Sequence, residues 1–330
     1  MARFDCRCDA RGYAVQRLSE IESAMDRRQW LRKSAAWGVA TGAIASASIG
    51  IPQPAHANLG AAKRLVCVGG ALTEMVFALE AQALLVGVDT TSLFPAAARA
   101  LPSVGYSRAL SAEGVLSLTP THVLATEDAG PPAVLRQLAA AGIPVAVLKA
   151  NHRFEGMLER VVQVGEMTLR PAQAAALTQR LRDDWARTQT QVAADQARWA
   201  LQRKSSPLRV LFVMSHSASQ IMVAGTATAA QAVIEYAGAV NAMAGFSGFK
   251  PMTPEAALAA QADVILGTEQ GLKAVGGVPG LLRLPGLAET PAGQAKRVVS
   301  LEAMLLLGFG PRLPTAVRDL SASLLAAMRA

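Results

Sequence analysis

The chain has 330 residues, of which 52% are apolar and 17% charged, a composition typical of a globular protein long enough for two domains and a sizeable core. Its formal charge is +8, and residues beyond 57 carry 24 basic and 19 acidic side chains, a balance of +5. No block of like charge or basic-aromatic stripe is present, so we expect no nucleic-acid partner. Of the cysteines Cys6, Cys8 and Cys67, only Cys67 would remain in a chain cut after residue 57, which rules out an internal disulfide framework and a Cys-rich metal site.

The first 57 residues predict an export signal. Residues 26–33 (DRRQWLRK) resemble the twin-arginine consensus and precede a mildly apolar run, Ala35–Ile51. A small-x-small pattern ends at Ala57, so we expect cleavage after about that residue and a periplasmic mature protein, with Met25 as the expected start. Two positions of the motif depart from the consensus, so the general secretory route stays open. An uncleaved membrane anchor is the alternative, although the run is short for a span.

Residues 58–168 predict the N-terminal lobe of an α/β protein. Short β-branched runs alternate there with helical stretches, the pattern of a parallel sheet covered by helices. The predicted strands are Leu65–Val68, Leu85–Val88, Val123–Ala125 and Val145–Leu148. The predicted helices are Thr73–Leu79, Ala112–Leu118 and Pro132–Ala141.

A long helix is predicted to join this lobe to a second one. After a helical stretch at 154–167, Pro171–Lys204 is rich in Ala, Leu, Gln and Arg and has no proline or glycine after its first residue. A helix of about 30 residues spans roughly 45 Å, which suits a rigid connection. We assign 169–204 to this linking helix and 205–330 to the C-terminal lobe. That lobe has predicted strands at Leu208–Met214, Val264–Leu266 and Val298–Leu301 and a last helix from about Pro314 to Met328.

An internal repeat relates the two lobes. Residues 111–127 align without gaps on residues 253–269, a constant offset of 142, and the same offset pairs Arg108 with Lys250. The alignment therefore indicates that the two lobes are copies of one structural unit. Ligands of open α/β sheets bind beyond the carboxyl ends of the strands, so we predict two Rossmann-like lobes with parallel-rich sheets, joined by one long α-helix, with a ligand cleft between them.

The stretch 104–118 combines reactive side chains with a capped helix. Tyr106 and Arg108 lie on a predicted loop, Ser111 is placed to cap the following helix, and Glu113 falls in its first turn. Loops on a rigid scaffold commonly carry binding groups. On this stretch alone, the alternative is that Tyr106 packs its ring and Arg108 is a solvated surface charge.

Enzyme motifs are not found. The Gly69–Glu74 turn lacks the third glycine of a dinucleotide fingerprint and the Lys-Ser/Thr of a phosphate loop. No nucleophile elbow, paired metal-binding histidines or Cys-His couple occurs, so we expect no enzymatic activity. Beyond the export signal the histidines are His122, His152 and His216. The last two follow predicted strands on the cleft side. Ligand binding and structural hydrogen bonding are the two alternative roles for these histidines.

Together these residues resemble the periplasmic haem-binding proteins of bacterial ABC haem importers, in which two lobes are joined by a single rigid helix. The similarity covers nearly all of residues 63–329, and its most specific part is the Gly-Tyr-x-Arg segment. It is carried by Gly69–Glu74 (GGALTE), Gly87–Thr91 (GVDTT), Pro102–Arg108 (PSVGYSR), Leu110–Leu116 (LSAEGVL), Glu127–Pro132 (EDAGPP) and Gly248–Glu255 (GFKPMTPE).

The resemblance implies that Tyr106 ligates haem iron, because phenolate is a hard anionic ligand suited to ferric iron. It also implies that Arg108 stabilises the phenolate or pairs with a haem propionate. From the second lobe it makes Lys250 a candidate propionate partner and assigns porphyrin contacts to Phe249 and Met252. Some relatives use a second-lobe histidine, which is missing from 224–228 here, so His216 is the substitute candidate for a second axial ligand.

The same resemblance implies the partners. In the wider family one glutamate per lobe docks onto the permease, and Glu113 and Glu255 match those positions; helix-dipole stabilisation is the alternative role. We therefore predict a periplasmic protein of iron acquisition that carries haem to an ABC permease and, through it, to the ATPase, with an outer-membrane haem receptor as a further candidate partner. A corrinoid or ferric siderophore is the alternative ligand, and an exported enzyme acting on tetrapyrroles is the alternative class.

Overall fold

The computed structural model describes residues 63–149, 151–202, 206–217 and 220–329. The predicted export signal at 1–57 lies outside these residues, so its cleavage stays a prediction. Residues Asn58–Ala330 form a single compact unit that contains both lobes. No described helix is both long enough and apolar enough to cross a membrane.

The first lobe is built on a parallel sheet with the strand order β2-β1-β3-β4. Its elements are β1 (Leu65–Val68), α1 (Gly70–Ala78), the 3-10 helix η1 (Gln82–Leu84), β2 (Leu85–Val88), the 3-10 helix η2 (Ala96–Ala100), α2 (Ala112–Leu116), β3 (His122–Thr126), α3 (Pro132–Ala140) and β4 (Val145–Leu148). All four residues of β1 are buried, as expected for a central strand covered on both faces. Three predicted strands match the observed bounds, and β3 extends the fourth by one residue at each end.

The second lobe contains a mixed sheet with the order β10-β9-β5-β6-β8, and β7 also pairs with β5. Its elements are β5 (Arg209–Ser217), β6 (Gln220–Ala224), α6 (Ala229–Tyr236), β7 (Val240–Asn241), β8 (Phe249–Pro251), α7 (Pro254–Ala259), β9 (Val264–Thr268), α8 (Glu269–Ala274), α9 (Gly277–Leu282), α10 (Pro291–Gln294), β10 (Val298–Leu301), α11 (Ala303–Leu307) and α12 (Leu313–Arg329). β10, β9, β5 and β7 are parallel, whereas β6 and β8 run antiparallel to their neighbours.

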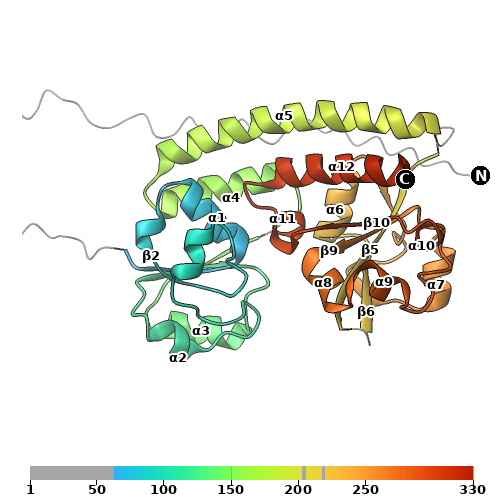
Figure 1. The fold of residues 1–330 in the computed structure, drawn as a ribbon. Coiled ribbons are helices and arrows are strands. Elements are labelled where there is room, and N and C mark those ends of the chain that lie inside the picture. Colours follow the sequence, from blue (N-terminus) through green and yellow to red (C-terminus); the bar gives the residue numbers. More distant parts are fainter. Residues whose placement is uncertain (1–62, 150, 203–205, 218–219, 330) are drawn as a thin grey trace, which may run out of the picture. The chain divides into compact units, whose positions relative to one another are not determined.

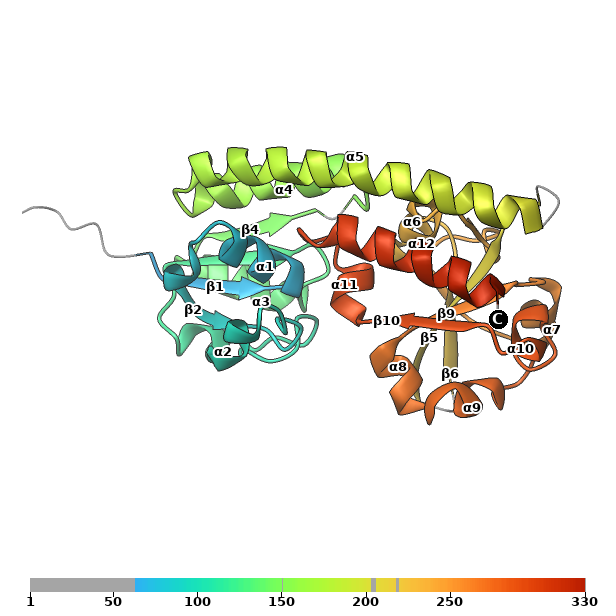
Figure 2. The ribbon, with the colours of Figure 1, turned by 45° about the horizontal axis from the view of Figure 1, so that its top comes forward.

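One long helix connects the lobes and follows the last helix of the first lobe. α4 (Phe154–Met167) has the predicted bounds, and α5 (Pro171–Gln202) begins at the predicted proline. α5 packs against α4 and also against α12 of the second lobe, as both ribbon views show (Figure 1, Figure 2). Trp185 on α5 stacks on Phe154, with ring centroids 4.5 Å apart, and meets the ring of Tyr236 edge-on at 4.8 Å. An apolar seam thus joins the linking helix to both lobes, and the predicted two-lobed α/β fold is confirmed.

The lobes repeat the same local structure at the predicted offset of 142 residues. Ser111 and Thr253 each cap a helix by accepting a hydrogen bond from the amide three residues later, at 3.2 Å in both cases. After these helices, Thr119 and Gln261 both adopt left-handed backbone, with φ of 46° and 45°. Because few non-glycine residues take this conformation, its recurrence at equivalent positions supports a duplicated unit.

Candidate ligand-binding site

A cavity of about 480 Å³ lies between the lobes. The first lobe contributes residues after β3 and β4, and the second lobe contributes α6 and the residues just before it. The lining consists of Glu127, Asn151, His152, Arg153, Ala227, Thr228, Gln231, Ala232, Glu235 and Tyr236. The cavity therefore adjoins the carboxyl ends of the first-lobe strands, where open α/β sheets bind ligands.

Tyr106 lies on a loop tied down on two sides. On one side, Val104 N donates to Val88 O at 2.9 Å and Thr90 N donates to Gly105 O at 3.0 Å; on the other, Gly130 N donates to Ser107 O at 2.8 Å. The Tyr106 residue itself is 47% exposed, and no described residue makes a hydrogen bond to its hydroxyl group. The backbone is therefore fixed while the phenol remains available to a ligand.

Arg108 is paired with Asp128 on the loop that follows β3. Its Nε and Nη2 both donate to Asp128 Oδ2, at 3.0 and 2.7 Å. Partial burial lowers the pKa of Arg108, but the hydrogen bond and charge of Asp128 and the charge of Tyr106 outweigh it and raise the pKa. Burial likewise opposes ionisation of Asp128, yet hydrogen bonds from Thr126 and Arg108 leave its pKa lowered. Both side chains are thus charged, and Asp128 adjoins the cavity residue Glu127.

The turn at Gly69–Gly70 supports the neighbouring loop. Gly69 N donates to Asp89 Oδ1 at 2.9 Å, and Gly70 N donates to Thr91 Oγ1 at 3.0 Å. Gly69 has φ of 122°, and a Cβ on Gly70 would lie 2.4 Å from Thr91 O, so both positions require glycine. These amides are therefore engaged by side chains of the loop after β2, in agreement with the absence of a phosphate loop from the sequence.

The second-lobe candidates do not share one face. Phe249 and Lys250 lie on β8, a strand that the sequence analysis did not predict, and neighbouring strand residues point to opposite sides. Phe249 is 39% exposed and contacts the ring of Phe212, whereas Lys250 Nζ lies 5.0 Å above the ring of Phe246. Phe212 belongs to the core cluster packed under α6, so Phe249 is on the side of the sheet covered by α6, the helix that lines the cavity, and this side is called the cavity side. Lys250 is on the other side.

Met252 and His216 are also placed differently from the expectation. Met252 is half-buried and packs against the second-lobe core formed with α7–α10. The sequence predicted that His216 follows a strand, but β5 continues to Ser217 because its second half pairs with β6. His216 therefore lies inside β5, next to an irregularity in the pairing, and its side chain is outside the described part of the structure.

Glu113 and Glu255 lie one in each lobe, in the first turns of α2 and α7. Both are exposed and, like Tyr106 and Arg108, neither is among the residues that line the cavity. The capping residues Ser111 and Thr253 fix the start of each helix, so the two carboxylates occupy matching positions on the repeated units.

His152 is a cavity residue to which the sequence gave no firm role. It has a left-handed backbone, with φ of 49°, and its ring lies edge-on to Phe309 at a centroid distance of 5.3 Å. Burial lowers the pKa of His152 and Arg160 adds to this effect, while Glu127 and Asp128 oppose it. Arg160 is itself buried: its Nη2 donates to Phe309 O at 2.6 Å, and burial lowers its pKa to about 10.

His122, by contrast, begins β3 at the opposite end of the strand. Its Nδ1 is 3.0 Å from Thr121 Oγ1, and it borders a small cavity of about 130 Å³ with Lys63 and Met167. This local contact agrees with a structural role. Among the described residues, no group of three or more His, Cys, Asp or Glu side chains is arranged to hold a bare metal ion.

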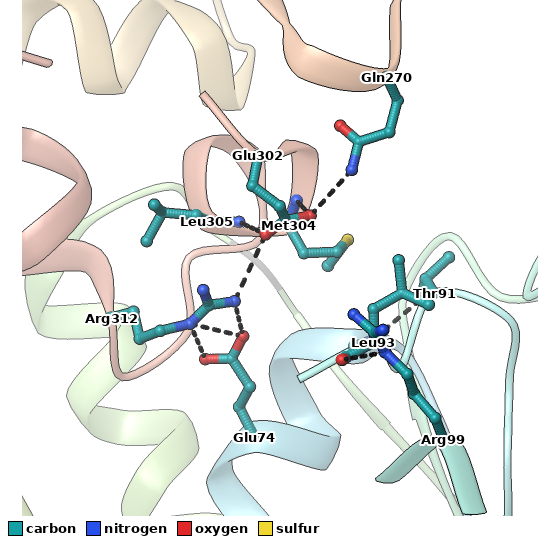
Figure 3. A network of polar contacts seen from close by, with 10 residues as sticks. Glu74, Thr91, Leu93, Arg99, Gln270, Glu302, Met304, Leu305 and Arg312 are labelled. Carbon is teal, nitrogen blue, oxygen red and sulfur yellow. Dashed lines mark hydrogen bonds and ion pairs between the residues drawn. The ribbon is translucent and has the colours of Figure 1, made fainter. Parts of the chain in front are cut away.

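An ionic network that the sequence analysis missed also bridges the lobes (Figure 3). Arg312, between α11 and α12, forms a bidentate pair with Glu74 on α1 and lies 3.5 Å from Glu302 Oε2. Glu302 in turn caps α11 by accepting from Met304 N and Leu305 N at 2.8 and 2.7 Å. Glu74 and Arg312 are 238 residues apart, so no local pattern could have revealed their contact.

The comparisons with known proteins agree with this architecture. A family model described as periplasmic binding protein matches residues 65–305. Solved structures of periplasmic haem-binding proteins also match, among them BhuT in complex with two haems, which is 47% identical with a TM-score of 0.75; the match covers 81% of this chain and 99% of that one. The resemblance inferred from the sequence is thereby confirmed.

Two curated relatives add to the comparison. An uncharacterised ABC transporter substrate-binding lipoprotein of Bacillus subtilis (strain 168) is 26% identical over 264 residues, 79% of this chain and 80% of the relative. A vitamin B12-binding protein of Yersinia pestis (strain Pestoides F) is 30% identical over 135 residues, which span 39% of this chain and only 48% of the relative. With the family model covering most of its length and the two-lobed fold in place, the chain belongs to the periplasmic binding protein family.

Proposed function

We propose that this chain is an exported, non-enzymatic substrate-binding protein that binds haem between its lobes and delivers it to an inner-membrane ABC importer. The observation that carries the proposal is Tyr106, an exposed phenol on a fixed loop with the cation of Arg108 two residues away. It is supported by the 47% identity to a protein whose structure is described as a periplasmic haem-binding protein in complex with two haems.

The chemistry of these residues suits ferric haem. Ferric iron is a hard Lewis acid, and a tyrosine phenolate is a hard anionic ligand used in other haem proteins. Arg108 favours the anionic phenolate and can pair with a haem carboxylate through the guanidinium hydrogens that Asp128 does not use. Tyr106 is thus the proposed iron ligand.

The second lobe supplies contacts of several kinds. Phe249 lies on the cavity side of the sheet and offers its ring to the porphyrin face. Lys250 would have to leave the ring of Phe246 to reach a propionate, and Met252 would contribute only its exposed part. His216 stays the candidate for a second axial ligand.

A corrinoid is the second candidate ligand. The observation in its favour is the 30% identity over 135 residues to a vitamin B12-binding protein. Haem is preferred because cobalamin has no need of an anionic phenolate at its metal, whereas ferric porphyrin gains charge neutralisation from one. The match to haem-binding structures also extends over a larger share of this chain.

Delivery is assigned to the two acidic helix starts. Glu113 and Glu255 are exposed at equivalent positions of the repeat, and paired acids on two lobes suit a two-fold permease with basic docking sites. The relative described as an ABC transporter substrate-binding lipoprotein supports a permease and its ATPase as partners. Export with cleavage near Ala57 and an outer-membrane haem receptor as the haem source stay predictions.

The test is ligand selection by the mature protein purified from the periplasm. Hemin, cyanocobalamin and a ferric hydroxamate siderophore are each titrated, with absorption spectra and equilibrium dialysis as readouts. We expect hemin to saturate with a shifted Soret band and to resist competition by the other two. Binding of cyanocobalamin alone would establish the corrinoid alternative. Loss of Soret absorbance on adding a reductant, with formation of a tetrapyrrole product, would establish an enzyme instead.

A further inference from the structure

The loop that carries Tyr106 and the loop after β3 form one framework. Gly130 N donates to Ser107 O at 2.8 Å, and Leu110 N donates to Gly130 O at 2.8 Å. Ser107 and Ala129 are each only 5% exposed, so the two loops are packed as well as hydrogen-bonded. The backbone therefore fixes where residue 128 lies relative to the ligand loop.

Asp128 uses this placement to hold one edge of the Arg108 guanidinium. Nε and Nη2 of Arg108 donate to the same oxygen, Asp128 Oδ2, at 3.0 and 2.7 Å. An Arg side chain has five donor hydrogens in a planar fork, so this contact orients the plane and leaves Nη1 free for another anion. This free Nη1 is on Arg108, which lies two positions after the proposed iron ligand, Tyr106.

The stability of the fold depends little on this pair. The side chains of Arg108 and Asp128 are 62% and 48% exposed, and ion pairs with such exposure contribute little to stability. A carboxylate near a phenolate and near haem carboxylates would, through its charge alone, weaken the binding of an anionic ligand. Asp128 therefore strengthens ligand binding only if its orientation of Arg108 contributes more to binding than its repulsion of the anionic ligand removes.

We propose that Asp128 is a positioning residue of the ligand site, which orients Arg108 so that its free guanidinium end serves the Tyr106 phenolate and a carboxylate of the bound porphyrin. The inference rests on the proposed function and assigns a role to a residue for which the sequence supplied none. Asp128 touches neither iron nor porphyrin and acts through Arg108.

The direction in which one substitution changes the haem dissociation rate distinguishes a positioning role of Asp128 from a pure charge effect. Asp128→Asn keeps the shape of the side chain and removes its charge. If Asp128 orients Arg108, the haem dissociation rate, measured by transfer to apomyoglobin, rises about fivefold, the loss expected for one exposed charged contact. If Asp128 acts by charge alone, repulsion is relieved and haem dissociates more slowly.

Comparing Arg108→Ala with the double variant Arg108→Ala/Asp128→Asn shows whether Asp128 affects the haem dissociation rate through Arg108. We expect the double variant to release haem no faster than Arg108→Ala, because Asp128 has nothing to orient once Arg108 is gone. We also expect the phenolate-to-iron charge-transfer band to shift in Asp128→Asn and to recover in Asp128→Glu. Asp184→Asn is the matched control, because it removes the partner of Arg187 from an exposed pair on α5.

Three results would overturn the inference: an unchanged or slower dissociation in Asp128→Asn, additive effects in the double variant, or an equal effect of Asp184→Asn. Each presupposes that the wild-type protein binds haem with a phenolate band. Failure of the wild type to bind hemin would instead overturn the proposed function, and this inference with it.

Discussion

Arg312 of the second lobe donates from Nε to both carboxylate oxygens of Glu74 in the first lobe, at 3.0 Å each. Glu74 is 5% exposed, and the guanidinium of Arg312 also lies 3.9 Å above the ring of Phe94. Burial raises the pKa of Glu74, and the hydrogen bond and charge of Arg312 counter that effect. A buried carboxylate of one lobe therefore depends on a cation from the other.

Removing this cation is expected to destabilise the fold. Arg312→Ala leaves the Glu74 carboxylate buried and unpaired, which costs about 3 kcal/mol of the free energy of unfolding. Chemical denaturation measures the loss. Adding Glu74→Gln to Arg312→Ala should recover part of it, because the buried charge is then absent. The control Arg187→Ala, which breaks an exposed pair with Asp184, should cost less than about 1 kcal/mol. Equal losses in the two Arg variants would contradict the account.

The pH dependence of the free energy of unfolding should report the protonation of His152. Burial lowers its pKa in the folded protein below the usual value of 6.5. As the pH falls below about 6.5, the unfolded chain takes up a proton before the folded one does, so the free energy of unfolding falls until the folded-state pKa is passed. The contribution of neutral His152 to the free energy of unfolding is therefore fully present above pH 6.5.

His152→Asn tests this dependence, because asparagine tolerates the left-handed backbone at this position but does not titrate. Denaturation of ligand-free protein at several pH values between 8 and 5 gives the difference in free energy of unfolding between wild type and variant. We expect the wild type to lose more stability than the variant on acidification. A difference independent of pH would show that His152 titrates alike in both states.

The proposed docking role of Glu113 and Glu255 predicts a defect in transport without one in binding. Glu113→Ala/Glu255→Ala should bind haem as the wild type does, because both carboxylates are exposed in the first turns of α2 and α7, outside the loop that carries Tyr106 and Arg108. It should stimulate the ATPase of the reconstituted importer at least about tenfold less, because two charge contacts to the permease are lost. Glu159→Ala/Glu289→Ala, which removes one exposed acid from each lobe, is the control. Equal stimulation by the two double variants would leave only the helix-dipole role.

Sequence patterns predicted the elements whose signals are local. β1, β2, β4 and β10 are short apolar runs with clear ends, and Ser111 caps α2 as its position before an acidic first turn indicated. The strand β8 was missed because three residues that include a proline show no alternation. The extension of β5 was missed because pairing with β6, and not its own composition, makes Ser215–Ser217 a strand.

The proximity of candidate site residues was predictable where one segment carries them. Tyr106 and Arg108 lie on the same loop, so their proximity followed from spacing. Asp128 is 20 residues from Arg108 and Arg312 is 238 from Glu74, so both contacts depend on the tertiary fold. A repeat offset pairs equivalent positions of two lobes, but Lys250, the counterpart of Arg108, points away from the cavity side because β8 alternates its side chains.

Replacing Tyr106 tests the central claim most directly. Hemin is titrated into the wild type and Tyr106→Phe, which keeps the ring and removes the hydroxyl, and absorption and resonance Raman spectra are recorded. We expect a ferric-phenolate signature in the wild type only, with affinity at least about tenfold weaker in the variant because an iron ligand is lost. If Tyr106→Phe retained the spectrum and affinity of the wild type, Tyr106 would not be the iron ligand.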